Sequence, residues 1–443
     1  MSKTTPPEIS GLPLLGNALE FRKDANGLFA RGYKQHGSVF TVHLGPRPAA
    51  VVIGPEHNRF VLEQTDKKFT MQEGYRFLIP MFGEQVFFVA GHEEYLEQKR
   101  LMLPAFRGRM MSSYVEVMQA ETERWLEGLG DEGEFDLVSS FEKLTMYIAA
   151  AALLGEDFRE RLGDRFADLY RDLAAGIEYL LPTNLPLPRF FRRDRAREKL
   201  EAMVKATIAE RRADPDKHDD FLQVFIDSTY SDGSPAPDAV ITALVMGLVF
   251  AGHETTAGHG SWAMVHLLEN HDFFERVVTD LDSAWPEDDV LSLSKLREFD
   301  SLEWALKETE RLQPVAEMLI RTTTETVEMN GYEIPEGWIV FLSPHVSHRL
   351  PELFKDPDTY DPLRFGPGRE EDRQDAYALV GFGGGPHKCL GMNFAYTEMK
   401  VIFSLLLHRY ELELLHPNPK AVRDAGTVRP ERPCMIRYKR RRS

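Results

Sequence analysis

The sequence predicts a mainly α-helical protein with small β-sheets, and three observations support this class. From about Glu93 to Glu210, charged and apolar residues recur at helical spacing, and Leu, Ala, Glu and Arg are in excess. A helix start at Pro237-Asp238 is followed by a run that is apolar on nearly every face. Short β-rich runs beside Gly-Pro and Asn-Gly turns lie before and after these helices. No linker-like segment interrupts the chain, so we expect one domain over residues 1–443.

The β-rich runs predict two hairpins. Val39–Ile53 holds two runs around Gly45-Pro46-Arg47-Pro48, a turn-rich break between strands. In Thr326–Val340, the pair Asn330-Gly331 is a strong hairpin signal between Thr326–Met329 and Tyr332–Val340. We therefore expect a small sheet near the N-terminus and a second sheet after the helices.

The helices are bounded by prolines and charges. Three prolines in Leu180–Phe191 predict a loop between two helices, because proline cannot sit inside a regular helix. Pro237 suits the start of the next helix and Asp238 its positive end. If this helix continues to Leu268, it covers about 31 residues or roughly 46 Å, enough to cross a whole domain. A further helix is expected over Ser301–Leu312.

Composition excludes some classes of function. The chain has 53 Lys plus Arg against 70 Asp plus Glu, a net charge of −17 that argues against a nucleic-acid partner. Its two cysteines, Cys389 and Cys434, allow at most one disulfide and fit a reducing compartment. No apolar run reaches the roughly 20 residues of a membrane-spanning helix. We therefore expect a soluble, cytoplasmic protein without a membrane anchor.

The most informative stretch is Phe382–Gly391, which reads FGGGPHKCLG. Its glycines would let a backbone loop approach something flat and bulky, and a helix-like pattern starts at about Leu390. Cys389 is then expected at a helix N-terminus, where the macrodipole and unpaired N–H groups stabilise a thiolate that can ligate a metal. The alternative is a buried, inert cysteine beside a glycine-rich turn.

This stretch resembles the haem-binding loop of the cytochrome P450 family, and the matching residues are Phe382, Gly385, His387, Cys389 and Gly391. His387 departs from the pattern, because most members carry Arg there. The resemblance implies the family's fold, a triangular helical prism with a long central helix. It also implies a haem b whose iron is bound by the Cys389 thiolate, with His387 hydrogen-bonded to a haem propionate.

A second motif is structural. Glu308-Thr309-Glu310-Arg311 supplies the family's Glu-x-x-Arg, whose spacing puts opposite charges on one helical face. The resemblance implies that Glu308 and Arg311 are locked in the core with a downstream arginine, here Arg364. Alone, the pair would be an ordinary surface ion pair.

A third motif lies in the long apolar helix. Residues 251–256 read AGHETT and resemble the family's oxygen-activation motif. Ala251 and Gly252 have no bulk, so dioxygen could lie against the helix. The resemblance implies that Thr255 hydrogen-bonds the oxygen and that Glu254 relays protons to it. A cap or a helix kink is the alternative.

The N-terminal half is similar to one group within the family. Residues 75–86 resemble a segment of sterol 14α-demethylases, and that comparison makes Tyr75, Lys99, Arg321 and His387 the propionate partners. Moving the alignment by one residue would replace Lys99 with Arg100. Those enzymes carry His immediately before the oxygen-site Thr, whereas this chain carries Glu254, which leaves the substrate open.

The expected substrate cavity is apolar and aromatic. Its candidate residues are Tyr75, Phe77, Leu78, Met81, Phe82, Phe87, Phe88, Leu180, Leu181, Phe250 and Ala251. Simple core packing is the alternative for each of them.

The sequence therefore predicts a haem-dependent monooxygenase that inserts one atom of O2 into a C–H bond of a bulky apolar lipid. Sterols, terpenoids and related lipids are the expected substrates, and 14α-demethylation is one form of the reaction. The alternatives are a fatty-acid or retinoid hydroxylase, a peroxygenase or haem-thiolate isomerase, and a non-catalytic haem protein. No Gly-rich nucleotide motif follows a strand, so electrons are expected from a separate ferredoxin or flavodoxin with its reductase, as in bacterial systems.

Overall fold

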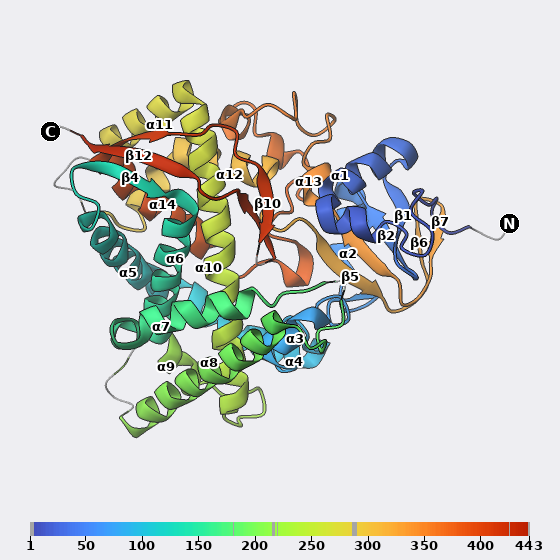
Figure 1. Cartoon of the computed structure of the whole chain (residues 1–443), viewed down its shortest axis with the longest axis horizontal. Helices are drawn as coiled ribbons and strands as arrows, with labels where there is room; N and C mark the ends of the chain where they lie inside the picture. Colours follow the sequence, from blue (N-terminus) through green and yellow to red (C-terminus); the bar gives the residue numbers. More distant parts are fainter. Residues whose placement is uncertain are drawn as a thin grey trace. The chain divides into compact units, whose positions relative to one another are not determined.

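The computed structural model describes residues 4–179, 181–214, 218, 220–285, 290–424 and 426–441. These residues form two compact units, each assembled from separate stretches of the chain (Figure 1). Unit 1 comprises Met1–Ile79, Glu178–Thr183 and Glu310–Cys389, and unit 2 comprises Pro80–Ile177, Asn184–Thr309 and Leu390–Ser443. The mainly helical class with small sheets is confirmed. That residues 1–443 form one domain stays a prediction.

Unit 1 is built on a five-stranded sheet in the order β1-β2-β8-β5-β3. Its strands are β1 Val39–Leu44, β2 Arg47–Val52, β3 Phe69–Thr70, β5 Leu319–Thr323 and β8 Ile339–Leu342. The first predicted hairpin is confirmed, because β1 and β2 pair antiparallel with Val39 opposite Val52. β8 then pairs parallel to β2, with Ala49 opposite Ile339. The sheet thus joins segments that lie almost 300 residues apart.

The second predicted hairpin is confirmed but shorter than expected. β6 (Val327–Met329) and β7 (Tyr332–Ile334) pair across Asn330 and Gly331, which both have positive φ, as a tight hairpin turn requires. The prediction that one strand runs from Tyr332 to Val340 is wrong, because this segment contains β7 and the start of β8. β7 stops before Pro335, which has no N–H to donate, and β8 joins the N-terminal sheet instead.

Helices and 3-10 turns complete unit 1. They are α1 Ala18–His36, α2 Pro55–Glu63, α13 Pro344–Ser347 and the 3-10 turns Arg76–Leu78, Pro362–Phe365, Glu371–Arg373 and Gly385–His387. α1 buries Phe21 and Phe29 against Phe341 of β8, with ring centroids 5.5 and 5.8 Å away. These rings form the core on one face of the sheet.

Unit 2 is largely helical. Its helices are α4 His92–Met102, α5 Gly108–Glu127, α6 Leu137–Leu154, α7 Glu156–Ala174, α8 Pro188–Ala213, α9 Phe221–Ile226, α10 Asp238–Glu269, α11 His271–Ala284 and α14 Met392–Arg409. α3 (Ile79–Phe82) and α12 (Asp300–Leu312) each have residues in both units, and unit 2 also contains the 3-10 turns Leu103–Phe106 and Lys295–Glu298. Two antiparallel elements complete it: a sheet of β4 Glu132–Asp136, β12 Met435–Arg440 and β9 Tyr410–Leu414, and a hairpin of β10 Ala421–Asp424 and β11 Thr427–Pro430.

The loop predicted over Leu180–Phe191 ends earlier than expected. α8 already begins at Pro188, because proline is well suited to the first position of a helix. Leu180 lies outside the described residues.

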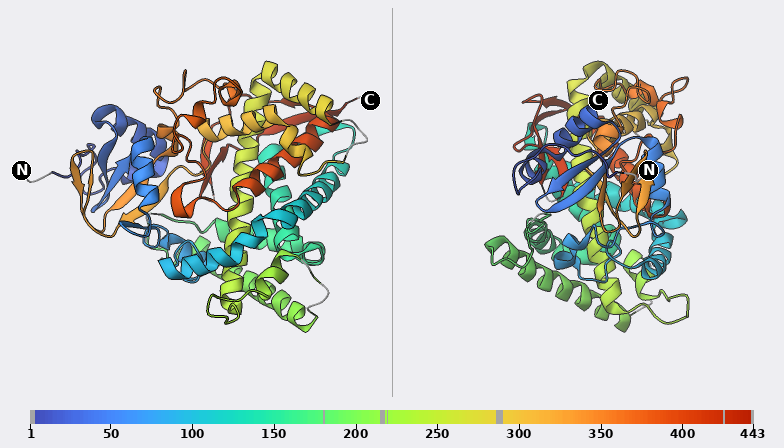
Figure 2. Two further views of the ribbon diagram at one scale, coloured as in Figure 1. Left: turned by 180° about the vertical axis from the view of Figure 1, so that it is seen from behind. Right: turned by 90° about the vertical axis from the view of Figure 1, so that its right-hand side faces the viewer.

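The long apolar helix is confirmed as α10, with 32 residues. α6 packs along it, and Figure 2 shows both helices from two further directions. Length and composition alone would let either helix cross a membrane. In both, however, 72% of the apolar window is buried inside the protein, as expected for core helices.

Candidate functional site

The loop before α14 presents the thiol of Cys389. Its ends are joined by a backbone hydrogen bond of 2.9 Å from Cys389 N–H to the carbonyl of Phe382. Cys389 is exposed. α14 begins at Met392, so Cys389 lies three residues ahead of the first helical residue. The prediction that Cys389 lies at the helix N-terminus is therefore wrong. Gly391 occupies the N-cap position.

Glycine is required in this loop because the loop lies directly against α2. Gly385 has a φ of +62°, and a Cβ placed there would lie 2.3 Å from the carbonyl oxygen of Leu62. A Cβ on Gly384 would lie 2.8 Å from the ring of Tyr377. Any side chain at these positions would push the loop away, so the glycines fix where Cys389 stands.

The two cysteines have opposite environments. Cys434 is 2% exposed. Burial, together with the charges of Asp136 and Glu269, raises the pKa of its thiol to about 12, so it stays neutral. Among the described residues, the cysteine that a metal can reach as a thiolate is therefore Cys389.

Three of the predicted propionate partners belong to unit 1. Arg321 is buried and donates from Nε to Thr65 Oγ1 at 2.9 Å. The Tyr75 hydroxyl accepts a 3.5 Å hydrogen bond from the backbone N–H of Ile320, so Tyr75 and Arg321 meet at β5. His387 Nε2 lies 2.7 Å from Asp66 Oδ2, a partner that no sequence motif indicated.

The fourth predicted partner, Lys99, lies on α4 in unit 2. Its ammonium group is 5.8 Å from the ring centroid of Tyr95. The alternative residue, Arg100, is held by Glu97 at 3.0 Å and by the carbonyl of Thr229 at 2.6 Å. These contacts hold Arg100 at the surface, and the choice of Lys99 stays a prediction.

The predicted cavity residues form aromatic groups in each unit. In unit 1, Phe77 packs on Tyr75 and on Tyr179, which the sequence did not single out, with centroids 5.9 and 4.6 Å away. In unit 2, Phe82 packs on Phe250 of α10 at 5.2 Å. The remaining candidates are Leu78 and Met81, which are buried, Phe87 and Phe88, whose rings are 4.1 Å apart, and Leu181, which is 38% exposed.

α10 has an opening in the middle of an otherwise buried helix. Residues 240–249 and 256–265 are all buried, whereas Phe250, Ala251, Gly252 and Thr255 are only half-buried. A Cβ added to Gly252 would meet no atom within 4 Å. The Thr255 hydroxyl donates to the carbonyl of Ala251 at 2.6 Å, which places both residues on one face. This face has room for a small molecule.

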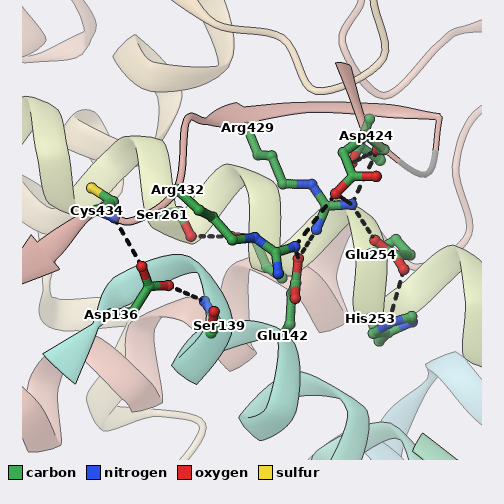
Figure 3. A network of polar contacts seen from close by, with 12 residues as sticks. Asp136, Ser139, Glu142, His253, Glu254, Ser261, Asp424, Arg429, Arg432 and Cys434 are labelled. Carbon is green, nitrogen blue, oxygen red and sulfur yellow. Dashed lines mark hydrogen bonds and ion pairs between the residues drawn. The ribbon is translucent and has the colours of Figure 1, made fainter. Parts of the chain in front are cut away.

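Glu254, next to this opening, is buried in a network of charges (Figure 3). Arg429 of β11 donates from Nη2 to Glu254 Oε2 at 2.9 Å. The other carboxylate oxygen lies 3.2 Å from His253 Nε2. Arg429 also forms an ion pair with Glu142 of α6. Neither Arg429 nor Glu142 belongs to a motif, so sequence reasoning missed both.

The residues predicted to be structural lie in the core. Glu308, Arg311 and Arg364 are fully buried. Within unit 1, Arg311 and Arg364 both donate to the carbonyl of Thr359, at 3.1 and 3.3 Å. Arg364 also binds the Glu371 carboxylate at 2.6 Å. These contacts support a structural role.

The donor set fits a haem. A reachable cysteine on a glycine loop suits iron, and a phenol with basic groups suits the carboxylates of the porphyrin.

Comparisons with known proteins agree with this chemistry. The family model "Cytochrome P450" matches residues 6–438. The obtusifoliol 14-alpha demethylase of Sorghum bicolor is 37% identical over 99% of this chain and 91% of its own length. The sterol 14alpha-demethylase of Mycolicibacterium vanbaalenii is 36% identical over 99% of this chain and 98% of its own. Among solved structures, retinoic acid-bound cyanobacterial CYP120A1 superposes with a TM-score of 0.92 at 26% identity, covering 100% of both chains.

Proposed function

Because this chain belongs to the cytochrome P450 family, it is a haem b-dependent monooxygenase, and we propose that its substrate is a bulky apolar lipid of the sterol class. The observation that carries the oxygen chemistry is the opening on α10, where Gly252 and Thr255 are half-buried within a helix that is buried on both sides of them. Such a small opening can admit dioxygen while the buried helix around it keeps bulk water away from the dioxygen.

The substrate class rests on the relatives and on the aromatic residues. Plant and bacterial relatives named as sterol demethylases match nearly the whole chain. The ring groups Tyr75–Phe77–Tyr179 and Phe82–Phe250 would supply apolar surface for a rigid, flat lipid. A retinoid is the second candidate, because the solved structure with a TM-score of 0.92 holds retinoic acid.

In the proposed site, the chain's own residues bind the haem and orient it. Cys389 would hold the iron through its thiolate, while Tyr75, Lys99, Arg321 and His387 would hold the two carboxylates. The haem, when bound, supplies the redox chemistry that activates dioxygen. Phe382, Gly385 and Gly391 would shape the loop around Cys389.

Proton delivery would depend on two side chains of α10. The hydroxyl of Thr255 can turn from the Ala251 carbonyl and donate into the opening. Glu254 would take protons from the solvent side and pass them toward Thr255, acting as a general acid–base group. Ala251 and Gly252 would leave the space in which this transfer takes place.

Members of this family normally receive electrons from a redox partner and use O2. We propose a separate ferredoxin or flavodoxin with its reductase as the donor here, since the exposed Lys388 beside Cys389 would attract an acidic protein. We also propose that the enzyme works in the cytoplasm, because its two long apolar helices are mostly buried.

The test is a titration of the purified ferric enzyme with sterols, triterpenes, retinoids and fatty acids, followed by turnover and product analysis. We expect a sterol or triterpene to shift the absorption spectrum of the ferric enzyme and to be oxidised. A response to retinoids alone would favour the second candidate. Cys389→Ser is the control for ligation: it should lose the red-shifted Soret band of the reduced, carbon monoxide-bound enzyme, whereas Cys434→Ser should keep it.

A further inference from the structure

The carboxylate of Glu254 is held on both sides. Arg429 reaches it from β11, with Nη2 2.9 Å from Oε2, and His253 lies 3.2 Å from Oε1. Glu254 and Arg429 are 7% and 3% exposed at their side chains, so solvent screens this pair little. A carboxylate bound in this way cannot move protons until the arginine loosens its hold.

Arg429 also has a second carboxylate within reach. Its other terminal nitrogen forms an ion pair with Glu142 of α6, the helix that packs along α10. Burial, together with the charge of Arg432, lowers the pKa of Arg429 to about 10, which still leaves the guanidinium protonated at neutral pH. One fixed positive charge is therefore shared between two acids on neighbouring helices (Figure 3).

From Arg429 the network continues to the surface. Glu142 is 20% exposed at its side chain, and it also pairs with Arg432, which is 39% exposed. Arg432 lies 3.4 Å from Asp424 Oδ2, and the Asp424 side chain is 54% exposed. The side chains of this network thus become more exposed step by step, from buried Glu254 and Arg429 to Asp424 in solvent.

We propose that Arg429 is a positioning residue shared by Glu142 and Glu254, and that Glu142 sets how readily Glu254 exchanges protons beside Thr255. When Arg429 leans toward Glu142, Glu254 becomes a buried carboxylate without a cation and takes up a proton. When Arg429 returns, the proton leaves on the side of Thr255. This inference rests on the proposed function, in which Glu254 moves protons.

Glu142 gives the sharpest test, because it lies outside the opening. In Glu142→Gln, Arg429 would lose one of its acidic partners and would hold Glu254 more firmly, because its other remaining acidic partner, Asp424, is 3.7 Å away and exposed. We expect a several-fold fall in product formed per reductant consumed and a larger solvent isotope effect on product formation. Substrate affinity, measured by titration of the ferric enzyme, should stay unchanged.

Arg429 itself is tested with two substitutions. Arg429→Met should reduce turnover by about tenfold to a hundredfold, below or near the lower end of the ~10²–10⁴-fold that a general acid–base group contributes. Arg429→Lys keeps the charge and should restore part of the loss. The matched control is Arg437→Met, since Arg437 also bridges two glutamates, Glu134 and Glu413, but is 53% exposed and belongs to the separate β4-β12-β9 sheet. It should behave like the wild type.

A measurement without turnover checks the same point. Infrared spectra of the resting ferric holoenzyme should show a protonated carboxyl band in Arg429→Met that is missing in the wild type. The band should vanish in Arg429→Met combined with Glu254→Gln, which assigns it to Glu254.

The outcomes separate the inference from the proposed function. If Glu142→Gln and Arg429→Met both keep wild-type coupling and isotope effect while Glu254→Gln loses them, the relay stands and the shared arginine is wrong. If Glu254→Gln also keeps both, the relay assigned to Glu254 is wrong. If Arg429→Met does not fold, Arg429→Lys and Glu142→Gln still decide the question.

Discussion

Two buried arginine networks, one in each unit, differ in what accepts their hydrogen bonds. In unit 1, Arg311 donates to the backbone carbonyls of His348, Pro357 and Thr359. Arg364 donates to the carbonyls of Lys355 and Thr359 and to Glu371. In unit 2, the partners of Arg429 include two ionisable side chains, Glu142 and Glu254.

This difference separates a fixed network from an adjustable one. A backbone carbonyl cannot take up a proton or swing away, so an arginine bound by carbonyls pins the chain in one conformation. A carboxylate can change both its charge and its rotamer, so an arginine shared by two carboxylates can change partners at low cost. We therefore expect substitutions in unit 1 to affect stability and those around Arg429 to affect proton transfer.

The largest effect is expected from Arg364→Met. This change removes one donor each from the Lys355 carbonyl, the Thr359 carbonyl and the Glu371 carboxylate, although Thr359 keeps Arg311 and Glu371 keeps Arg369. Because a fully buried guanidinium with three partners is lost, we expect unfolding to become easier by about 3–5 kcal/mol. Urea unfolding followed by circular dichroism, with haem content measured alongside, tests this. Arg373→Met is the matched control, because that side chain is 75% exposed and forms a surface ion pair with Glu370.

Adding Glu371→Gln to Arg364→Met should not restore stability, because the Lys355 and Thr359 carbonyls would still lack the hydrogen bonds of Arg364. A full recovery would show that the carboxylate, and not the backbone, makes this network fixed. The contrast with Arg429 would then disappear.

A second effect is expected on lowering the pH, because buried His348 makes the folded protein less stable in acid. The ring of His348 accepts a hydrogen bond of 2.8 Å from the Val380 N–H, and burial, with the charges of Arg311 and Arg349, lowers its pKa to about 3. Below pH 6.5 the unfolded chain binds a proton that the folded ring does not. Stability should thus be full above pH 6.5 and fall as the pH drops toward 3, by about 2 kcal/mol at pH 5 from this group.

To check this pH dependence, the free energy of unfolding is measured at pH 7.5 and at pH 5 for the wild type and for His348→Gln. Gln keeps an acceptor for Val380 but does not titrate, so its pH difference should be smaller by about 2 kcal/mol. Burial also lowers the pKa of His345 to about 3 and of His259 to about 4, and these groups act with the same sign. An equal slope in both proteins would show that His348 is not the acid-sensitive group.

Local sequence signals predicted the elements better than their long-range pairing. The apolar run predicted α10, and the pair Asn330-Gly331 predicted the β6–β7 hairpin, because both signals act between residues close in the sequence. The parallel pairing of Ala49 with Ile339 leaves no such signal, so the place of β8 in the N-terminal sheet was missed. The start of α14 at Met392 was also missed by two residues, since helix ends depend on tertiary contacts.

The candidate site shows the same division. Cys389, Thr255 and Arg364 were found because they lie in short motifs or at fixed distances from them. Asp66, Glu371 and Arg429 were not, although each binds a residue that the motifs indicated. Glu142 was also missed, and it binds Arg429. Ion-pair partners are chosen by the fold, so charged residues in ordinary strands and helices carry no local mark of their role.

The stability effect that sharpens the comparison most is expected around Arg429, and it should be smaller than that at Arg364. Arg429→Met should cost about 1–3 kcal/mol, because Glu254 is left buried without its cation but can take up a proton. Unlike the loss at Arg364, this loss should be largely recovered when Glu142→Gln and Glu254→Gln are added, since both of these acids are then neutral. The third acid near Arg429, Asp424 at 3.7 Å, is 54% exposed and stays solvated. Urea unfolding of the single and triple variants at pH 7.5 measures the recovery. If the triple variant stays as unstable as Arg429→Met, Arg429 is fixed by its bond to the Asp424 carbonyl, at 3.1 Å, and belongs with the structural arginines of unit 1.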